Sequence, residues 1–248
     1  SEAGVTAVSS VAEVVERCEL ILSIAPSSAV FEIAEQVAAA ITQQPPLFVD
    51  CNAISPETAK QLAKITTRAG GRFADASIVG PPIEPGKATT FYVSGAESPS
   101  LLSLRGLQLN VELIGDEIGQ ASGFKMLYAG LTKGLSALST ELLVTAAGLG
   151  LADQIMQKYH RDFPGLAQLI ERLIPSLPFR AARRSIEMQE LDVTMRSAGL
   201  EPSMPLAAAE VLRRIGEMRL ESRFSSQDEE GWSWNDVVEI FRQEITDR

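Results

Sequence analysis

The sequence has few positively charged residues, and they are unevenly spread. Its 248 residues carry a formal net charge of −10, and Arg17 is the only basic residue before Lys60. A protein that binds nucleic acid needs a face rich in lysine and arginine to contact phosphates. We therefore expect no nucleic-acid partner, and the acidity mainly favours solubility.

Side chains that bind transition metals or form disulfides are also scarce. The chain has one histidine, His160, and two cysteines, Cys18 and Cys51. Because metals such as zinc are held by clusters of these side chains, we expect no metal site. Each cysteine lies in or beside an apolar run, so we interpret both as reduced core residues, with a disulfide or reactive pair as the alternative.

Long apolar runs are missing as well. No stretch approaches the roughly 20 residues of a membrane-spanning helix. The first residues, Ser-Glu-Ala-Gly, lack the basic and apolar segments of a signal peptide. We expect a cytoplasmic protein with no membrane partner. Hydrophobic residues make up 45% of the chain, which is enough to build a buried core.

The first half of the chain alternates strand and helix patterns. Short apolar runs that end at turn residues predict strands. These runs cover residues 20–24, 47–49, 73–79, 89–93 and 109–114. Helical periodicity covers residues 28–41, and Ser55 followed by Pro56 marks the start of another helix. Strand–helix–strand units of this length predict an α/β domain with a mostly parallel sheet.

After Gly115 the strand patterns stop. Residues 117–149 form one long apolar segment rich in small residues, and residues 178–199 and 205–222 are amphipathic. We therefore expect an α/β domain over residues 1–115 and an all-α domain over residues 116–248.

Two turns of the first half carry groups suited to ligand binding. Residues 23–28 connect a strand to a helix, whose N-terminal N–H groups and dipole favour an anion. Residues 50–56 follow the next strand, and Asn52 among them can both donate and accept, as a carboxamide or ribose partner requires. By themselves, both turns are more simply interpreted as ordinary capped turns.

A third segment, residues 119–134, places Lys125 among apolar neighbours. If the segment is helical, Ala129 and Thr132 share a face with Lys125, while Lys133 lies roughly 80° away. Burial lowers the pKa of a lysine and makes it usable as a proton shuttle. The alternative is a lysine whose stem lies on apolar surface while its amine reaches water.

The order and spacing of these segments resemble the β-hydroxyacid dehydrogenase and 6-phosphogluconate dehydrogenase superfamily. Ile24-Ala25-Pro26 takes the place of the family's hydrophobic pair and proline beside the cofactor. Residues 50–56 are similar to the turn near the nicotinamide, and residues 75–81 to the substrate loop. Lys125 falls on the catalytic lysine. The likeness is clearest over residues 3–134, and it favours a branch with a phosphogluconate-dehydrogenase-like C-terminal domain.

The resemblance implies a Rossmann-like first domain, NADP or NAD as cofactor, and a small-molecule substrate. Lys125 would act as general acid and base. The implied cofactor-binding residues are Ser23, Ile24, Ala25, Pro26, Ala29 and Asn52. The implied substrate-binding residues are Ser77, Val79, Gly80, Ser122 and Ala129.

Several positions depart from the family pattern. Val79 and Pro81 replace a serine and a glycine that hold a substrate carboxylate in the family, so carboxylate recognition is in doubt. Ala129 replaces an asparagine, and Thr132 replaces the glutamate that serves as general acid in decarboxylating members. Oxidative decarboxylation of phosphogluconate is therefore not expected.

The Gly-x-Gly-x-x-Gly turn with which the family begins does not occur in the chain. We favour the interpretation that residues precede this chain, because a sheet without its central strand would expose a buried edge. The choice between NAD and NADP stays open.

Three functions are compatible with these observations. The first is hydride transfer between nicotinamide and a carbon that bears a hydroxyl or carbonyl group, with Lys125 as acid and base. The second is an imine reductase-like activity, and the third is non-catalytic binding of a ligand or partner. The resemblance also implies a homodimer through the helical domain, and the small residues between Ala129 and Gly148 fit either that contact or packing within one chain.

Overall fold

The computed structural model describes residues 4–80, 89–107, 109–220 and 232–246. The chain divides into two compact units, Ser1–Leu127 and Tyr128–Arg248. Pro81, where the sequence departs from the family's substrate loop, lies outside the described residues.

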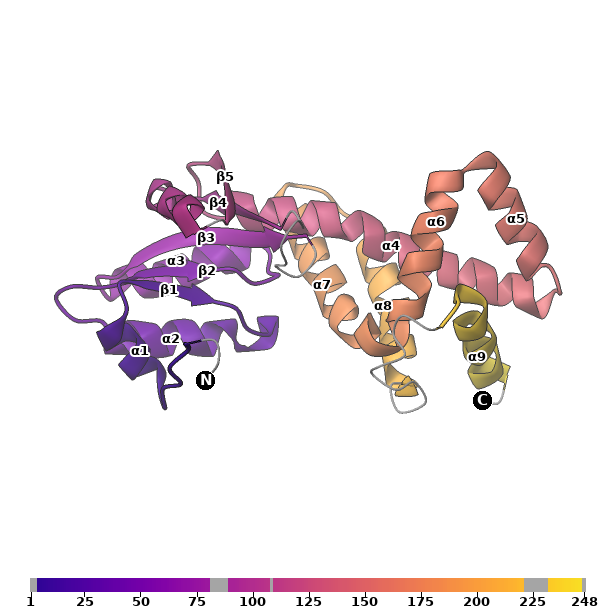
Figure 1. Cartoon of the computed structure of the whole chain (residues 1–248), viewed down its shortest axis with the longest axis horizontal. Coiled ribbons are helices and arrows are strands. Elements are labelled where there is room, and N and C mark those ends of the chain that lie inside the picture. The colour runs from indigo at the N-terminus through magenta and orange to yellow at the C-terminus, as the bar shows by residue number, and fades with distance from the viewer. Residues whose placement is uncertain (1–3, 81–88, 108, 221–231, 247–248) are drawn as a thin grey trace. The chain divides into compact units, whose positions relative to one another are not determined.

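A five-stranded sheet forms the centre of the first unit, with the strands in the order β1-β2-β3-β4-β5 (Figure 1). The strands are β1 (Leu20–Ser23), β2 (Leu47–Asp50), β3 (Arg72–Val79), β4 (Thr90–Ser94) and β5 (Asn110–Gly115). All neighbouring strands are parallel except β3 and β4. The predicted α/β fold with a mostly parallel sheet is therefore confirmed.

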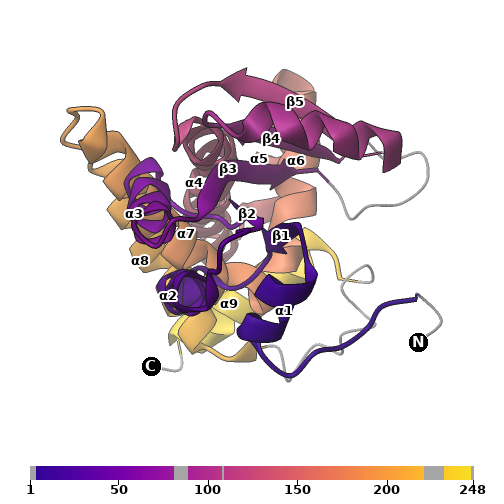
Figure 2. The same cartoon turned by 90° about the vertical axis from the view of Figure 1, so that its left-hand side faces the viewer.

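Helices cover both faces of this sheet (Figure 2). One face carries α1 (Val11–Arg17), α2 (Val30–Ala40), which follows the short 3-10 helix η1 (Ser27–Ala29), and α3 (Pro56–Arg68). The other face carries the 3-10 segment η2 (Ser98–Leu107). Helix α3 begins as predicted, because the Ser55 hydroxyl accepts a hydrogen bond from the backbone N–H of Thr58 at 3.2 Å.

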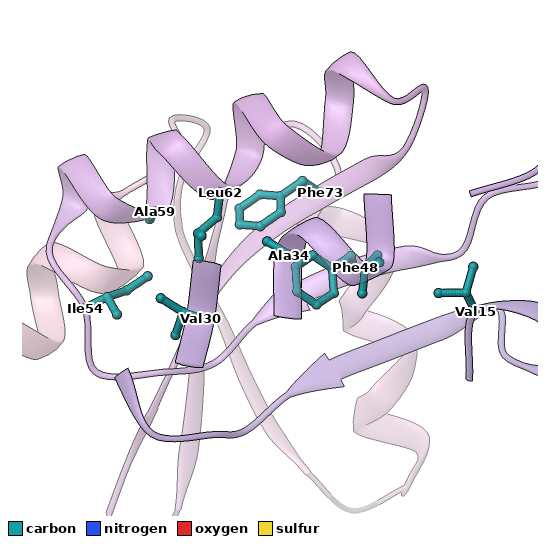
Figure 3. Close-up of a cluster of buried hydrophobic side chains, with 9 residues drawn as sticks. Val15, Val30, Ala34, Phe48, Ile54, Ala59, Leu62 and Phe73 are labelled. Atoms are coloured by element: carbon teal, nitrogen blue, oxygen red, sulfur yellow. The ribbon is translucent and has the colours of Figure 1, made fainter. Parts of the chain in front are cut away.

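Two apolar clusters hold these layers together. The cluster under α1, α2 and α3 is centred on Phe48 and Phe73, whose rings meet edge to face at 5.8 Å (Figure 3). Its buried members are Val15, Val30, Ala34, Val37, Phe48, Ile54, Ala59, Leu62 and Phe73. The opposite cluster includes Val49, Ala74 and Leu101 of η2. Side chains alternate between the two faces along each strand, as expected for period-two geometry.

The two cysteines differ in their surroundings. Cys51 is buried beside β2, as predicted. Cys18 is exposed, so its prediction as a core residue is wrong. It is the C-terminal cap of α1, where the chain turns to enter β1 and its side chain faces water.

Helix α4 (Gln120–Gly148) starts in the first unit and continues into the second. The remaining elements are α5 (Ala152–Asp162), α6 (Pro164–Leu173), η3 (Ile174–Ser176), α7 (Leu177–Ser197), α8 (Met204–Glu217) and α9 (Trp234–Thr246). The described residues after Gly115 contain no strand, so the predicted change to an all-helical second half is confirmed. Among these described helices, none has the length and apolar content needed to span a membrane.

Small residues allow helices of the second unit to approach one another. A Cβ on Gly130 of α4 would lie 2.5 Å from the Leu191 side chain of α7. A Cβ on Gly216 of α8 would lie 2.9 Å from the backbone of Ala182 on α7. Part of the small-residue run of α4 thus packs inside the unit, as the intramolecular interpretation required.

Candidate functional site

The sheet face under α1, α2 and α3 changes from apolar to polar at the end of β2 and at the neighbouring position of β3. Phe48 is followed two residues later by Asp50, and Phe73 is followed two residues later by Asp75. Asp50 and Asp75 are register partners on neighbouring parallel strands, and both side chains are fully buried. In open α/β sheets, ligands bind outside the carboxyl ends of the strands. These carboxyl groups mark the candidate site.

Asn52 joins the turns that follow β1 and β2. Its amide nitrogen Nδ2 donates to Ser23 Oγ at 3.1 Å and to Asp50 Oδ1 at 2.5 Å. Its carbonyl oxygen Oδ1 accepts from the backbone N–H of Ala25 at 2.6 Å. Both amide hydrogens are therefore used within the protein, and one lone pair of Oδ1 is left for a ligand. The role of Asn52 beside a cofactor stays a prediction, but its structural role is clear.

The turn held by Asn52 presents apolar surface. Ile24 is 66% exposed although it directly follows a strand, and Pro26 is exposed beside it. The backbone N–H of Ala29 donates to the Pro26 carbonyl at 2.9 Å, which forms the short helix η1 before α2. The structure thus brings together the cofactor-binding residues that the resemblance implied.

Asp75 binds the first turn of α4. Its Oδ2 accepts from the backbone N–H groups of Gly119 at 2.9 Å and Ser122 at 3.0 Å, and from the Ser94 hydroxyl at 3.1 Å. Its Oδ1 accepts from the Ser122 hydroxyl at 2.6 Å. Ser122, implied as a substrate-binding residue, therefore has its hydroxyl engaged by Asp75.

Lys125 lies one helical turn after these contacts. Residues three and four positions apart share a helix face, so Lys125 lies on the same side as the buried Ala121 and Ser122. Lys125 is half-buried, and its charge lowers the pKa of Asp50. The predicted helix around Lys125 is confirmed. The lysine interacts electrostatically with Asp50 at the carboxyl edge of the sheet.

Burial controls the ionisation of the groups around Lys125. Burial raises the pKa of Asp50 from 3.8 to about 6, although hydrogen bonds from Asn52 lower it. Burial likewise raises the pKa of Asp75. The pKa of the Cys51 thiol rises to about 12, chiefly through burial, so this cysteine is not a nucleophile at neutral pH.

The other predicted substrate residues have different surroundings. Ser77 on β3 is fully buried, and its hydroxyl has no hydrogen-bond partner among the described residues. Val79 ends β3, and Gly80 follows it, exposed and with a φ of +134°. Ala129 belongs to the second unit, where its carbonyl accepts from the Thr132 hydroxyl at 3.0 Å. Substrate binding by these residues stays a prediction.

Sequence reasoning did not single out Asp50, Asp75 or Ser94 as individual site residues. A charged residue inside an otherwise apolar strand, as in Phe73-Ala74-Asp75-Ala76, is a signal that could have identified Asp75. Ser94 carries no comparable signal, because serine is common at strand ends and its partners lie far away in the sequence.

Comparison with family models found two matches, one in each half of the chain. Residues 1–102 match the NAD binding domain of 6-phosphogluconate dehydrogenase. Residues 146–215 match a domain of unknown function, DUF1932.

Individual relatives support this assignment. An uncharacterized 28.5 kDa protein from Methanothermus fervidus is 27% identical over 69% of this chain and 66% of its own length. A conserved hypothetical protein from Sinorhizobium meliloti 1021 has a similar structure, with a TM-score of 0.70 and 26% identity over 98% of this chain and 80% of that one.

A second solved structure, of a conserved protein of unknown function, is described as similar to 3-hydroxyacid dehydrogenases. It has a TM-score of 0.66 and 27% identity, over 89% of this chain and 83% of that one. Together with the two family models, these likenesses support the 6-phosphogluconate dehydrogenase-like and 3-hydroxyacid dehydrogenase-like superfamily of NAD(P)-dependent oxidoreductases for this chain.

Proposed function

We propose that this protein transfers hydride between NADP or NAD and a carbon of a small substrate that bears a hydroxyl or carbonyl group. Lys125 acts as the general acid and base. The observation that carries the proposal is the placement of Lys125, half-buried on a helix that is bonded to the carboxyl edge of the sheet and coupled electrostatically to Asp50.

The residues after β1 fit the nicotinamide end of the cofactor. Ile24 and Pro26 present apolar surface at the carboxyl edge, which suits the face of an aromatic ring. Asn52 holds this turn in place through Ala25 and keeps one acceptor site for a carboxamide N–H. Bound there, the nicotinamide would supply or take up the hydride.

Lys125 handles the proton that accompanies hydride transfer. In the oxidative direction its neutral amine accepts the hydroxyl proton, and in the reductive direction its ammonium donates a proton to the carbonyl oxygen. A positive charge at this position also stabilises the oxyanion that develops in the transition state.

Replacing Lys125 tests this role. Lys125→Ala should lower kcat by roughly 10²- to 10⁴-fold, the range of acid–base contributions, while the affinity for NADPH or NADH is retained. Lys158, exposed on α5, provides the matched control, and Lys158→Ala should leave turnover unchanged. Undiminished turnover of Lys125→Ala would show that the mechanism is wrong.

The substrate panel separates the alternatives. We would first titrate the natural protein with NADPH and NADH by fluorescence, and then assay 2-keto acids, 3-hydroxy acids and cyclic imines. Turnover of imines alone would favour the imine reductase-like activity. Binding of neither cofactor and turnover of no substrate would favour the non-catalytic alternative.

We also propose that two copies pair through the helical domain. Leu131, Leu138 and Leu142 are each at least 47% exposed on α4. Their spacing of seven and four residues places them on one face of the helix. An exposed apolar stripe of this kind is typical of a protein–protein contact, and a symmetric dimer would cover it in both copies.

A further inference from the structure

The N-terminus of α4 has all its backbone N–H groups satisfied, but mostly by other elements. The first N–H groups of a helix have no partner within the helix itself. Here Gly119 and Ser122 donate to Asp75 of β3, and Ala121 donates to the Ser94 hydroxyl of β4 at 3.0 Å. Only the N–H of Gln120 has a local acceptor, the Glu117 carbonyl at 3.3 Å. The helix start is therefore bonded to two neighbouring strands.

Asp75 and Ser94 form a connected pair within this arrangement. They are register partners on β3 and β4, and the Ser94 hydroxyl donates to Asp75 while it accepts from Ala121. The Asp75 carboxyl accepts four hydrogen bonds from the described residues, and these lower its pKa, although burial is the larger effect and raises it. A negative charge at a helix N-terminus is also stabilised by the helix dipole.

Steric contacts hold the same helix start from its other side. Gly119 has a φ of +99°, which favours glycine, and a Cβ there would lie 2.9 to 3.0 Å from Pro56 at the start of α3. A Cβ on Gly123 would lie 3.2 Å from the Pro56 ring. The start of α4 thus packs tightly between α3 and the strands β3 and β4, which leaves the helix little freedom to rotate or shift.

We propose that Asp75, together with Ser94, is a positioning residue for Lys125. The two side chains fix the first turn of α4, and Lys125 follows that turn by three residues on the same face. Asp75 acts through the helix rather than through contact with the substrate. The inference rests on the proposed function of Lys125, but its geometric part can be measured without turnover.

Two variants and one control test the proposal. Asp75→Asn removes the charge and places an amide N–H₂ opposite backbone donors. Ser94→Ala removes the bond to Ala121 without a change of charge. Phe73→Leu, on the same strand but in the apolar cluster, controls for a general loss of stability. The first readout is the pH at which Lys125 is half acylated by acetic anhydride, which we call the acylation midpoint. Mass spectrometry measures the acylation, and exposed Lys158 serves as the reference. The second readout is the separate values of kcat and KM.

In Asp75→Asn, the acylation midpoint of Lys125 should move to lower pH, because the released helix start lets the lysine move away from the Asp50 charge that favours its ammonium form. In the same variant kcat should fall on the order of 10²-fold, the effect of displacing a catalytic group by about 1 Å, with the KM for the cofactor retained. Ser94→Ala should change the midpoint and kcat less, and Phe73→Leu should change neither.

A Lys125 midpoint that stays at the wild-type value in folded Asp75→Asn would overturn the proposal. If Asp75→Asn does not fold, Ser94→Ala provides the test instead. A Lys125 midpoint and a kcat in Ser94→Ala equal to those of Phe73→Leu would then overturn the proposal. If the midpoint moves as expected but the wild-type protein reduces or oxidises no substrate, the positioning role stands and the proposed function fails.

Discussion

Single carboxyl groups decide the character of the candidate site. Asp50 and Asp75 are fully buried, and each directly follows apolar residues of its strand. Burying an ionised group costs free energy unless hydrogen bonds and opposite charges compensate it. Asn52 provides hydrogen bonds to Asp50, and the start of α4 provides them to Asp75. The sheet edge thus holds two buried carboxyl groups, and the ionisation of Asp50 is coupled to Lys125.

The raised pKa of Asp50 predicts a specific pH dependence of stability. Because its pKa is about 6 in the folded protein and 3.8 ordinarily, the folded state holds the proton more tightly between roughly pH 4 and 6. The free energy of unfolding should therefore fall as the pH rises through this window, by about 3 kcal/mol from this group. Asp50→Asn removes this contribution, so its stability relative to wild type should improve by a similar amount from pH 4 to pH 7.

Urea unfolding of both proteins at several pH values measures this difference. The comparison between variant and wild type cancels the contributions of all other titrating groups. A difference in unfolding free energy that stays constant from pH 4 to pH 7 would contradict the raised pKa.

Helix ends and helix contacts determine how the elements are held. In the first unit, α3 has a local cap in Ser55, whereas α4 depends on side chains of β3 and β4. In the second unit, α4 and α7 approach closely at Gly130 and are joined by an ion pair between Lys133 and Glu187 at 2.7 Å. Both side chains of this pair are at most 14% exposed, and burial is the main reason that the pKa of Lys133 is lowered.

Breaking this buried pair should be costly, whereas replacing both partners should not. Glu187→Gln leaves the charge of Lys133 without its main counterion, and we expect a loss of about 3 kcal/mol in the free energy of unfolding. The double variant Lys133→Met, Glu187→Met should recover most of this loss, because two apolar side chains suit the same surroundings. Urea unfolding of the two variants measures both effects.

The exposed pair Lys158–Asp162 on α5 is the matched control. Asp162→Asn should change stability little, because water screens charges on the surface. Equal effects of Glu187→Gln and Asp162→Asn would show that burial does not matter at Lys133.

At the scale of the whole molecule, the chain combines a NAD-binding domain with a helical domain that exposes apolar surface. Part of the small-residue run of α4 packs inside the second unit, because Gly130 faces Leu191 and Ala137 is buried. Several large side chains of the same helix, among them Leu131 and Leu138, are exposed. The dimer contact that we propose therefore uses leucines rather than the small residues.

Charges introduced on the leucine face should separate the proposed dimer. Wild-type protein should have a mass near twice 26.7 kDa by light scattering, and Leu131→Glu with Leu138→Glu should reduce it to a single chain. Leu200→Glu, at another exposed leucine of the same unit, should leave the mass unchanged. A monomeric wild-type protein would show that the dimer proposal is wrong.

Local patterns in the sequence were sufficient to predict most of the elements. The runs that predicted β1 to β5 and the Ser55-Pro56 start of α3 all agree with the structure. The reason is that period-two alternation, helical periodicity and caps depend on neighbours within a few residues. The short α1 and η2 were not predicted, and at Cys18 an apolar neighbourhood suggested burial that the cap position does not provide.

The sequence by itself determined the alternation of strands and helices in the first half and the change to helices after Gly115. It also identified Lys125 as the candidate catalytic residue. Only the tertiary structure decided which polar groups are free to act. Asn52 looks available in the sequence, yet its amide is bonded to Ser23, 29 residues earlier. Asp75 looks like one residue of a loop motif, yet it holds the start of α4, 44 and 47 residues later. Hydrogen bonds over such distances leave no local pattern, because their partners meet only when the sheet has formed.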